Sequence, residues 1–309
     1  MIPDACGHDM RDFFARIYAP QKLQGKSEKT KYQYEIQIGR FGCFLKREPR
    51  LTDLTDEVVS EFLGWVLTQG RTAGTANKAR NHLLAIWRMA ARKRLVELYP
   101  DVMPLREPRR VPKAWMQSDL AKLFDACKRA AGGWNGIKAA DWWTGLHSVA
   151  WDTAERIGAL MQLEWDWLDL ETRWLIVPAE ARKGKRADKA FLLHPLTVGQ
   201  LERIRGSGSR FIFVWPWTQE TLWNRYDKLL VGAGLPHDRK SKFHRMRKSA
   251  ASWFEAAGGN ATELLDHTMR RTTEAYLDPR IAVKPQASDM LFRPDPTILA
   301  VHTPNAYVG

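Results

Sequence analysis

The chain has 309 residues, of which 48 are Lys or Arg and 35 are Asp or Glu, so its formal net charge is +13. This length suffices for two domains with a hydrophobic core each, and the charge favours a polyanionic partner, with nucleic acid as the first candidate. The cysteines Cys6, Cys43 and Cys127 are scattered without metal-ligand spacing, which argues against a structural zinc site and fits a reducing compartment. There is no signal-peptide pattern at the start and no apolar run as long as a membrane span.

The first hundred residues predict helices joined by short turns. Thr30 is expected to cap the first helix. Its apolar stripe would comprise Tyr34, Ile38, Phe41 and Leu45. Thr55 and Gly70 are expected to begin and end a second helix. Thr75 precedes a third, with the sequence ANKARNHLLAIWRMAARKR.

This third helix has an apolar face and a basic face. The predicted inner face comprises Leu83, Ile86, Trp87 and Ala90. The basic side chains left outside are Lys78, Arg80, Arg88, Arg92, Lys93 and Arg94. A solvated helix face accounts for such charge as readily as contact with DNA does, so this pattern alone leaves both interpretations open.

Residues 100–114 form the clearest linker in the chain, because they are rich in proline and have little apolar periodicity. Beyond them the pattern becomes mixed. Helices are predicted at about 118–129, 139–152, 218–232 and 243–257. Residues 172–194 predict a β-hairpin with a lysine-rich tip, and its first strand is 174–177. The expected fold is therefore mainly α with a small antiparallel β-hairpin, so that the second half is an α+β domain.

Several side chains could together act on a phosphodiester. They are, in chain order, Arg156, Lys183, Lys185, His244, Arg247, His267 and Tyr276. The pair His244 and Arg247 would share one helix face, because residues three apart lie on the same side. Each of these residues alone is more often structural than catalytic, so the hypothesis of a common site depends on their order along the chain.

Cleavage of a phosphodiester without metal gives each residue type a role. Two arginines, Arg156 and Arg247, suit the two non-bridging oxygens, on which charge grows in the transition state. Tyr276 can form a phosphotyrosyl ester, and His244 could accept the proton of its phenol. The departing 5′ oxygen needs a proton donor, for which Lys183 is preferred over Lys185 on the hairpin tip.

These stretches resemble, in order, the tyrosine recombinase, or phage integrase, family. The family's first-arginine segment is similar to TAERIGALMQLEWDWLDLE, and its hairpin with the catalytic lysine to PAEARKGKRADKAFLLHPL. The H-x-L-R box resembles FHRMRKSAASWFEAAGG, and the box with L-G-H and T-x-x-Y resembles LLDHTMRRTTEAYLDP. The basic helices of residues 8–98 look like the family's core-binding domain.

The resemblance implies two domains that form a clamp around DNA. Residues 1–99 would be a helical, SAM-like core-binding domain, 100–114 a linker and 115–285 the catalytic domain. Residues 286–309 would be a tail, either on the surface or docked on a neighbouring subunit. Since the helices begin close to the start of the chain, we expect binding to simple core sites only.

The resemblance also implies a mechanism and partners. Tyr276 would attack a DNA phosphate to give a 3′-phosphotyrosyl link, with His267 donating a hydrogen bond to the same phosphate and no metal or nucleotide cofactor. A tetramer would exchange strands between two double-stranded sites through a Holliday junction, which is compatible with a monomer in solution. We expect a cytoplasmic protein, nucleoid-associated when bound to DNA and without a membrane partner. The expected DNA contacts are Lys78, Arg80, Arg88, Arg92, Lys185 and Arg245.

Some positions depart from the family pattern. Ala159 stands where the family usually has an acidic residue, so an accessory carboxylate is expected to be missing. Glu155 would point in another helical direction and is not an obvious replacement. Asp266 replaces the usual glycine before His267, and Met246 the usual leucine of the H-x-L-R box.

Two alternatives to an active recombinase follow from the same residues. A catalytically impaired DNA-binding protein of the same fold is favoured only by Ala159. A type IB topoisomerase-like enzyme would share the nucleophile, but the core-binding-like helices argue against it. A metal-dependent nuclease is set aside, since no carboxylates or histidines cluster at the required spacing.

Overall fold

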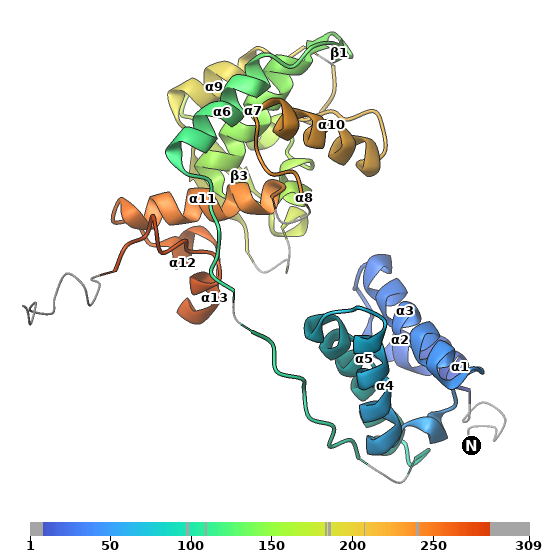
Figure 1. The fold of residues 1–309 in the computed structure, drawn as a ribbon. Coiled ribbons are helices and arrows are strands. Elements are labelled where there is room, and N and C mark those ends of the chain that lie inside the picture. Colours follow the sequence, from blue (N-terminus) through green and yellow to red (C-terminus); the bar gives the residue numbers. More distant parts are fainter. Residues whose placement is uncertain are drawn as a thin grey trace, which may run out of the picture. The chain divides into compact units, whose positions relative to one another are not determined.

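The computed structural model describes residues 9–96, 99–108, 110–182, 184, 187–206, 208–238 and 241–284. Over these ranges the chain is mainly helical with two small antiparallel sheets, so the predicted fold class is confirmed. It divides into two compact units, Met1–Arg109 and Arg110–Gly309 (Figure 1). The predicted tail at 286–309 lies outside the described residues.

The first unit is helical throughout. Its elements are α1 (Met10–Phe13), a π-helix (Phe14–Tyr18), α2 (Ala19–Lys22), α3 (Glu28–Leu45), a 3-10 turn (Leu51–Asp53), α4 (Asp56–Thr68) and α5 (Ala73–Arg92). The predicted inner face of α5 is confirmed, because Leu83, Ile86, Trp87 and Ala90 are all buried. They pack with Phe41 of α3 and Phe62 of α4 in one hydrophobic core.

Two helix starts in this unit differ from the prediction. The N-cap of α3 is Ser27, and Thr30 lies in the first turn with its hydroxyl 3.1 Å from that of Ser27. The N-cap of α5 is Thr72, whose side chain accepts a hydrogen bond from the amide of Thr75. In both cases two hydroxyl residues stand three apart, as an N-cap and the third helical position do, and the sequence does not tell which one caps.

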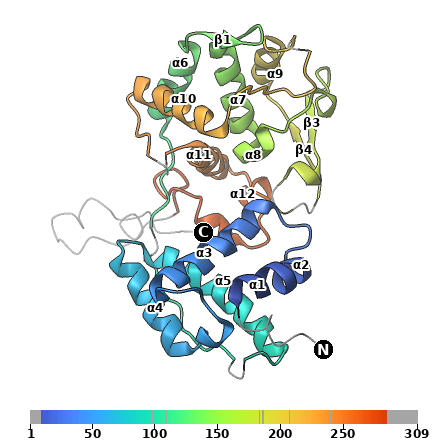
Figure 2. The same cartoon turned by 90° about the vertical axis from the view of Figure 1, so that its right-hand side faces the viewer.

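The second unit contains the remaining helices and both sheets. Its helices are α6 (Gln117–Lys128), α7 (Ala139–Thr153), α8 (Ile157–Leu160), α9 (Pro195–Glu202), α10 (Gln219–Gly232), α11 (Phe243–Ala256), α12 (Ala261–Leu264) and α13 (Arg270–Glu274). Short 3-10 turns cover Trp165–Trp167 and Ala179–Ala181. Helix α7 contacts α6, α9 and α11, and lies in the middle of this unit (Figures 1 and 2).

The predicted hairpin is confirmed. Strands β3 (Trp174–Val177) and β4 (Lys189–Leu192) pair antiparallel, with Trp174 opposite Leu192 and Val177 opposite Lys189. A second, two-residue pairing of β1 (Gly133–Trp134) with β2 (Ile137–Lys138) was not predicted. Its turn residues Asn135 and Gly136 both have positive φ, 51° and 75°. An Asn-Gly pair is the usual signal for such a turn, but strands this short leave no alternation to detect.

A histidine is enclosed in the core of the second unit. His147 of α7 is fully buried among aromatic rings, and its Nδ1 lies 2.7 Å from the carbonyl of Trp143. Its Nε2 has no hydrogen-bond partner within the described part of the chain. Burial lowers the pKa of His147 to about 4, so the folded protein keeps this imidazole neutral.

Acidification is therefore expected to weaken this unit. The unfolded chain binds the proton at a pKa near the ordinary value, so the free energy of unfolding should fall between about pH 6.5 and 4, by about 3 kcal/mol for this residue. His147→Gln, which does not titrate, should reduce that slope in chemical denaturation at several pH values. His237→Gln, at an exposed position, is the matched control. An unchanged slope in His147→Gln would contradict this origin of the acid sensitivity.

Candidate active site

Five of the residues predicted for catalysis lie in one cluster of the second unit. Arg156 stands between α7 and α8, and His244 and Arg247 lie on α11. His267 precedes α13, and Tyr276 follows it. Ring contacts and charge interactions connect all five. The predicted lysines Lys183 and Lys185 lie outside the described residues.

Tyr276 is the centre of this cluster. Its ring centroid lies 5.1 Å from that of His244 and 4.9 Å from that of His267. The guanidinium carbon of Arg247 lies 5.7 Å from the same ring. Tyr276 is half-buried, with two imidazoles and a guanidinium around its ring.

The backbone on both sides of Tyr276 is anchored to the rest of the second unit. The hydroxyl of Ser252 on α11 donates to the Tyr276 carbonyl at 3.3 Å and accepts from the amide of Asp278 at 2.9 Å. The buried Asp278 carboxylate accepts from the amide of Ala114 at 2.8 Å and from the Arg280 side chain. Burial alone would raise the pKa of Asp278, but these hydrogen bonds lower it to about 2.

Arg247 is almost completely buried and is held by backbone carbonyls. Its guanidinium donates to the carbonyl of Ala154, which ends α7, and to that of Leu265, which ends α12, the latter at 2.9 Å. Burial and the charge of Arg156 together lower the pKa of Arg247 to about 10, although Glu155 opposes the change. The two carbonyls therefore fix a charged group in a place where water does not solvate it.

Arg156 provides the second positive charge of the site. It is the N-cap residue of α8, and no hydrogen bond of its guanidinium is found to any described residue. Burial lowers the pKa of His267, and Arg247 and Arg156 lower it further. The Nδ1 of His267 lies 3.1 Å from the Thr273 hydroxyl, which orients the ring. The positive charges of Arg156 and Arg247 repel each other and disfavour a further positive charge on His267. Such a group of charges is a suitable site for an anion such as phosphate.

The expectation that the site lacks an accessory carboxylate is wrong. Glu155 is buried, its Oε1 accepts from Arg182 Nε at 2.7 Å, and its Oε2 lies 3.9 Å from Arg247 Nη1. The prediction assumed that Glu155 continues a helix. In the structure Ala154 has φ 49° and ends α7, so helical directions do not apply to the next residue. Ala159 itself is buried on α8.

Two residues of the hairpin have roles that the sequence did not reveal. Arg182 contacts both Glu155 and Asp266, the latter at 3.2 Å. Lys189 Nζ donates to the carbonyls of Glu263 at 2.5 Å and Leu264 at 2.8 Å, and burial lowers its pKa. These bonds tie the base of the hairpin to the end of α12. Only long-range folding brings the partners together, so no local motif could indicate them.

The departure at Asp266 also has a structural reason. Its φ is 55°, in the left-handed region that glycine adopts without strain and that Asp tolerates better than most residues. The family's usual glycine suits this backbone conformation. Asp266 keeps the conformation and adds a carboxylate that accepts from Arg182.

Of the six predicted DNA contacts, Lys185 lies outside the described residues and the other five fall into two groups. Lys78, Arg88 and Arg92 are exposed on α5. Arg80 instead donates through Nε to the carbonyl of Val102 at 2.7 Å, which ties the segment after α5 to that helix. Arg245 lies over the ring of Trp115 with its guanidinium carbon 3.8 Å from the centroid. Lys78 also donates to the Gln33 side chain, but it is exposed. Arg80 and Arg245 are both partly buried and engaged within their own units, so we do not retain them as proposed DNA contacts.

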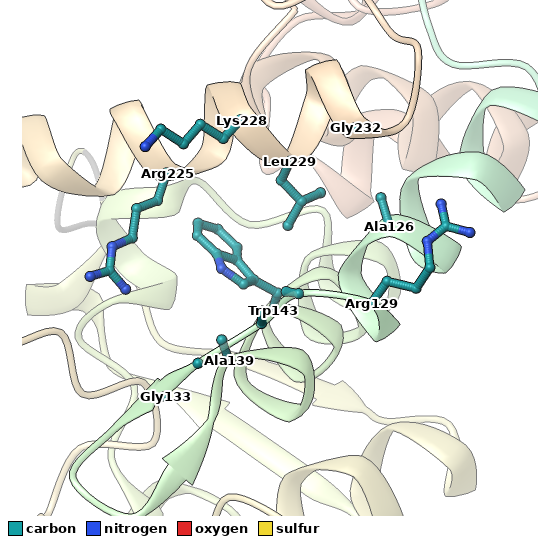
Figure 3. A pocket seen from close by; sticks show the side chains of 12 residues that line it. Ala126, Arg129, Gly133, Ala139, Trp143, Arg225, Lys228, Leu229 and Gly232 are labelled. Atoms are coloured by element: carbon teal, nitrogen blue, oxygen red, sulfur yellow. The ribbon is translucent and has the colours of Figure 1, made fainter.

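A separate pocket lies between the end of α6, β1, α7 and α10. Arg129, Arg225 and Lys228 surround Trp143 there (Figure 3). Arg129 is paired with Asp125, and the guanidinium of Arg225 lies over aromatic rings. None of the described residues lining this pocket belongs to the cluster around Tyr276, so its basic character is independent of that cluster.

A comparison with known protein families identifies the segment that contains this cluster. Residues 116–282 match the phage integrase family, and this segment is more than half of the chain. The chain therefore belongs to the phage integrase family of tyrosine recombinases. A search of the curated proteins finds no significant sequence match.

Solved structures share the fold at low sequence identity. A lambda integrase (75-356) dimer bound to a COC' core site is 18% identical, with a TM-score of 0.67 and coverage of 89% of this chain and 98% of that one. A lambda integrase tetramer bound to a Holliday junction has the same identity and TM-score and coverages of 88% and 78%. The Tn1549 transposon integrase with transposon right end DNA is 13% identical, with a TM-score of 0.71 and coverages of 91% and 97%.

No helix within the described ranges is long and apolar enough to cross a membrane. Among the same residues, no three His, Cys, Asp or Glu side chains group closely enough to hold a metal ion. The cluster around Tyr276 thus consists of a phenol, two imidazoles, two guanidinium groups and a buried carboxylate.

Proposed function

We propose that the chain is a site-specific DNA recombinase that breaks and rejoins strands through a covalent bond between Tyr276 and a DNA 3′ phosphate. The observation that carries this proposal is the contact of the Tyr276 ring with His244 and His267, beside the guanidinium of Arg247. Metal-free phosphoryl transfer requires a nucleophile, a base and fixed positive charge, and these residues can supply all three.

In the cleavage step, Arg156 and Arg247 bind the non-bridging oxygens of the scissile phosphate. The phosphate's negative charge offsets the repulsion between these two guanidinium groups. The phenol oxygen of Tyr276 attacks phosphorus while His244 accepts its proton, and His267 donates a hydrogen bond to the phosphate. The bond to the 5′ oxygen breaks, and that oxygen takes a proton from the hairpin lysine, for which we keep Lys183 ahead of Lys185.

Rejoining reverses these steps with another strand. A 5′ hydroxyl of the partner DNA attacks the 3′-phosphotyrosyl bond, and the phenol of Tyr276 leaves with a proton. The ester conserves the free energy of the broken phosphodiester, so the proposal requires no nucleotide and no metal. The first exchange of one pair of strands gives a Holliday junction, and a second exchange of the other pair resolves it.

Charge and family support the proposed partners. We propose that the +13 chain binds double-stranded core sites, with the exposed Lys78, Arg88 and Arg92 of α5 on phosphates. The first unit would serve as the core-binding domain and close with the catalytic unit around DNA. Lambda integrase forms a tetramer on a Holliday junction, and we propose the same assembly for this chain.

The alternative of an impaired DNA-binding protein has little support. The missing carboxylate at Ala159 was the only feature that favoured it, and Glu155 places a carboxylate beside Arg247. A topoisomerase-like activity would use the same residues without pairing two sites. An assay with two core sites on separate DNA molecules distinguishes the two activities, because only a recombinase would join strands of one molecule to the other.

A trapping assay tests the proposed function. A candidate core site from the DNA that flanks the gene, nicked close to the scissile phosphate, loses a short 5′-hydroxyl fragment after cleavage and cannot be rejoined. The protein should then accumulate as a covalent adduct that survives denaturant, and a metal chelator should not prevent it. If no such site yields an adduct, the recombinase proposal is wrong and the DNA-binding alternative gains.

A further inference from the structure

The family's accessory acidic position is occupied by Ala159, and yet a carboxylate is buried in the site of this chain. The Glu155 side chain is 2% exposed and that of its partner Arg182 is 7% exposed. Removing two charges from water is costly, and a pair this deeply buried is stable only when each member keeps its partner. The pair is therefore not part of the solvated surface.

The carboxylate of Glu155 lies among three arginines. Its Oε1 accepts from Arg182, while its Oε2 accepts from the amide of Arg156 at 3.1 Å and lies 3.9 Å from Arg247 Nη1. A single negative charge thus lies beside the backbone of one proposed clamp residue and the side chain of the other. It offsets the repulsion between guanidinium groups that would otherwise separate them.

Arg182 connects Glu155 to two further segments, the base of the hairpin and the segment before His267. Its Nη1 donates to the carbonyl of Ala187 at 3.2 Å, which closes the base of the hairpin. The same nitrogen donates to the Asp266 carboxylate at 3.2 Å, one residue before His267. Segments that supply Arg156, Arg247 and His267 are therefore joined through one buried ion pair.

We propose that Glu155 and Arg182 form a positioning pair that holds the arginine clamp and the base of the hairpin in place for DNA cleavage. Glu155 thereby replaces, from a different position in the chain, the carboxylate absent at Ala159. This inference rests on the proposed function. Neither Glu155 nor Arg182 reacts with DNA in this proposal. The pair instead affects the cleavage rate by positioning Arg156, Arg247 and the hairpin.

The test measures single-turnover adduct formation on the nicked site, together with DNA affinity and melting temperature. Glu155→Gln keeps the shape but leaves three cations without their carboxylate, so adduct formation should slow by about 10- to 100-fold. DNA affinity should stay within about two-fold, because the pair is buried. Glu180→Gln, the same change at an exposed residue near Arg182, should behave like wild type.

A double-mutant cycle separates positioning from two independent effects. Arg182→Met alone should slow cleavage strongly, because the buried Glu155 loses the donor to its Oε1 and the base of the hairpin loses its contact with Asp266. Combined with Glu155→Gln it should cost no more than the worse single change, whereas independent residues would multiply their losses. Multiplied losses, or wild-type cleavage by Glu155→Gln, would overturn the positioning pair.

Failure of this inference can be distinguished from failure of the proposed function. If wild type forms no adduct, the function itself is wrong. If wild type forms it and Glu155→Gln matches its rate, only the positioning pair is wrong. Should Glu155→Gln unfold at the assay temperature, Arg182→Lys decides by the same rate comparison. It keeps the charge but loses the planar fork, so cleavage at the wild-type rate would count against the pair.

Discussion

Tyr276→Phe is expected to abolish the covalent adduct while DNA affinity stays within about two-fold of wild type. The substitution removes one oxygen and keeps the ring, which packs against His244 and His267. No hydrogen bond of the phenol to another described residue is found, so its loss leaves no buried partner unsatisfied. The melting temperature should therefore change little. The measurement is denaturing electrophoresis of labelled nicked DNA after incubation with each protein.

Tyr99→Phe provides the matched control. Tyr99 is 59% exposed and lies outside the second unit, so the same substitution there should leave adduct formation unchanged. An adduct formed by Tyr276→Phe at the wild-type rate would show that another group attacks the phosphate. An adduct lost by both variants would instead indicate a general effect on DNA binding or folding.

Arg247→Lys is expected to slow cleavage by at least about 100-fold, although it preserves the charge. Lysine has a single ammonium group at the end of a flexible chain. It cannot satisfy the carbonyls of Ala154 and Leu265 and also present a planar pair of donors to phosphate. Since those carbonyls are buried, a stability loss of about 1–3 kcal/mol should accompany the change.

Cleavage rate and affinity must be measured separately for this variant. DNA affinity should be nearly unchanged, because most of the binding energy comes from phosphates elsewhere on the site. Arg205→Lys, at an exposed arginine of the same unit, should have no effect on either quantity. Equal cleavage by Arg247→Lys and wild type would remove Arg247 from the proposed clamp.

Sequence patterns were sufficient where the physical signal is local. The cap at Thr55, the glycine at Gly70 and the strand Trp174–Val177 each depend on neighbouring residues, and the structure confirms them. The apolar stripe of α5 is similarly a direct consequence of helical periodicity. A common site was predicted from the order of its residues along the chain and from the family resemblance, and the structure brings five of them together.

Local patterns were insufficient where the chain leaves regular structure or folds back on itself. The direction of Glu155 depends on the left-handed conformation of Ala154, which nothing in TAER indicates. The attachment of Arg80 to Val102 and of Arg245 to Trp115 depends on segments distant in sequence. A basic residue in a motif can hold the protein together, and only its partners show which role it has.

The carboxylate of Asp278 connects the segment of Tyr276, the proposed nucleophile, to the start of the second unit. It binds the amide of Ala114, while the amide of Asp278 itself binds the Ser252 hydroxyl that also holds the Tyr276 carbonyl. Tension on the chain at Ala114 therefore reaches the residue two positions after Tyr276 without passing through the hydrophobic core. If Tyr276 is the nucleophile, as proposed, the segment at the start of the second unit and the segment that carries the reacting phenol cannot move independently.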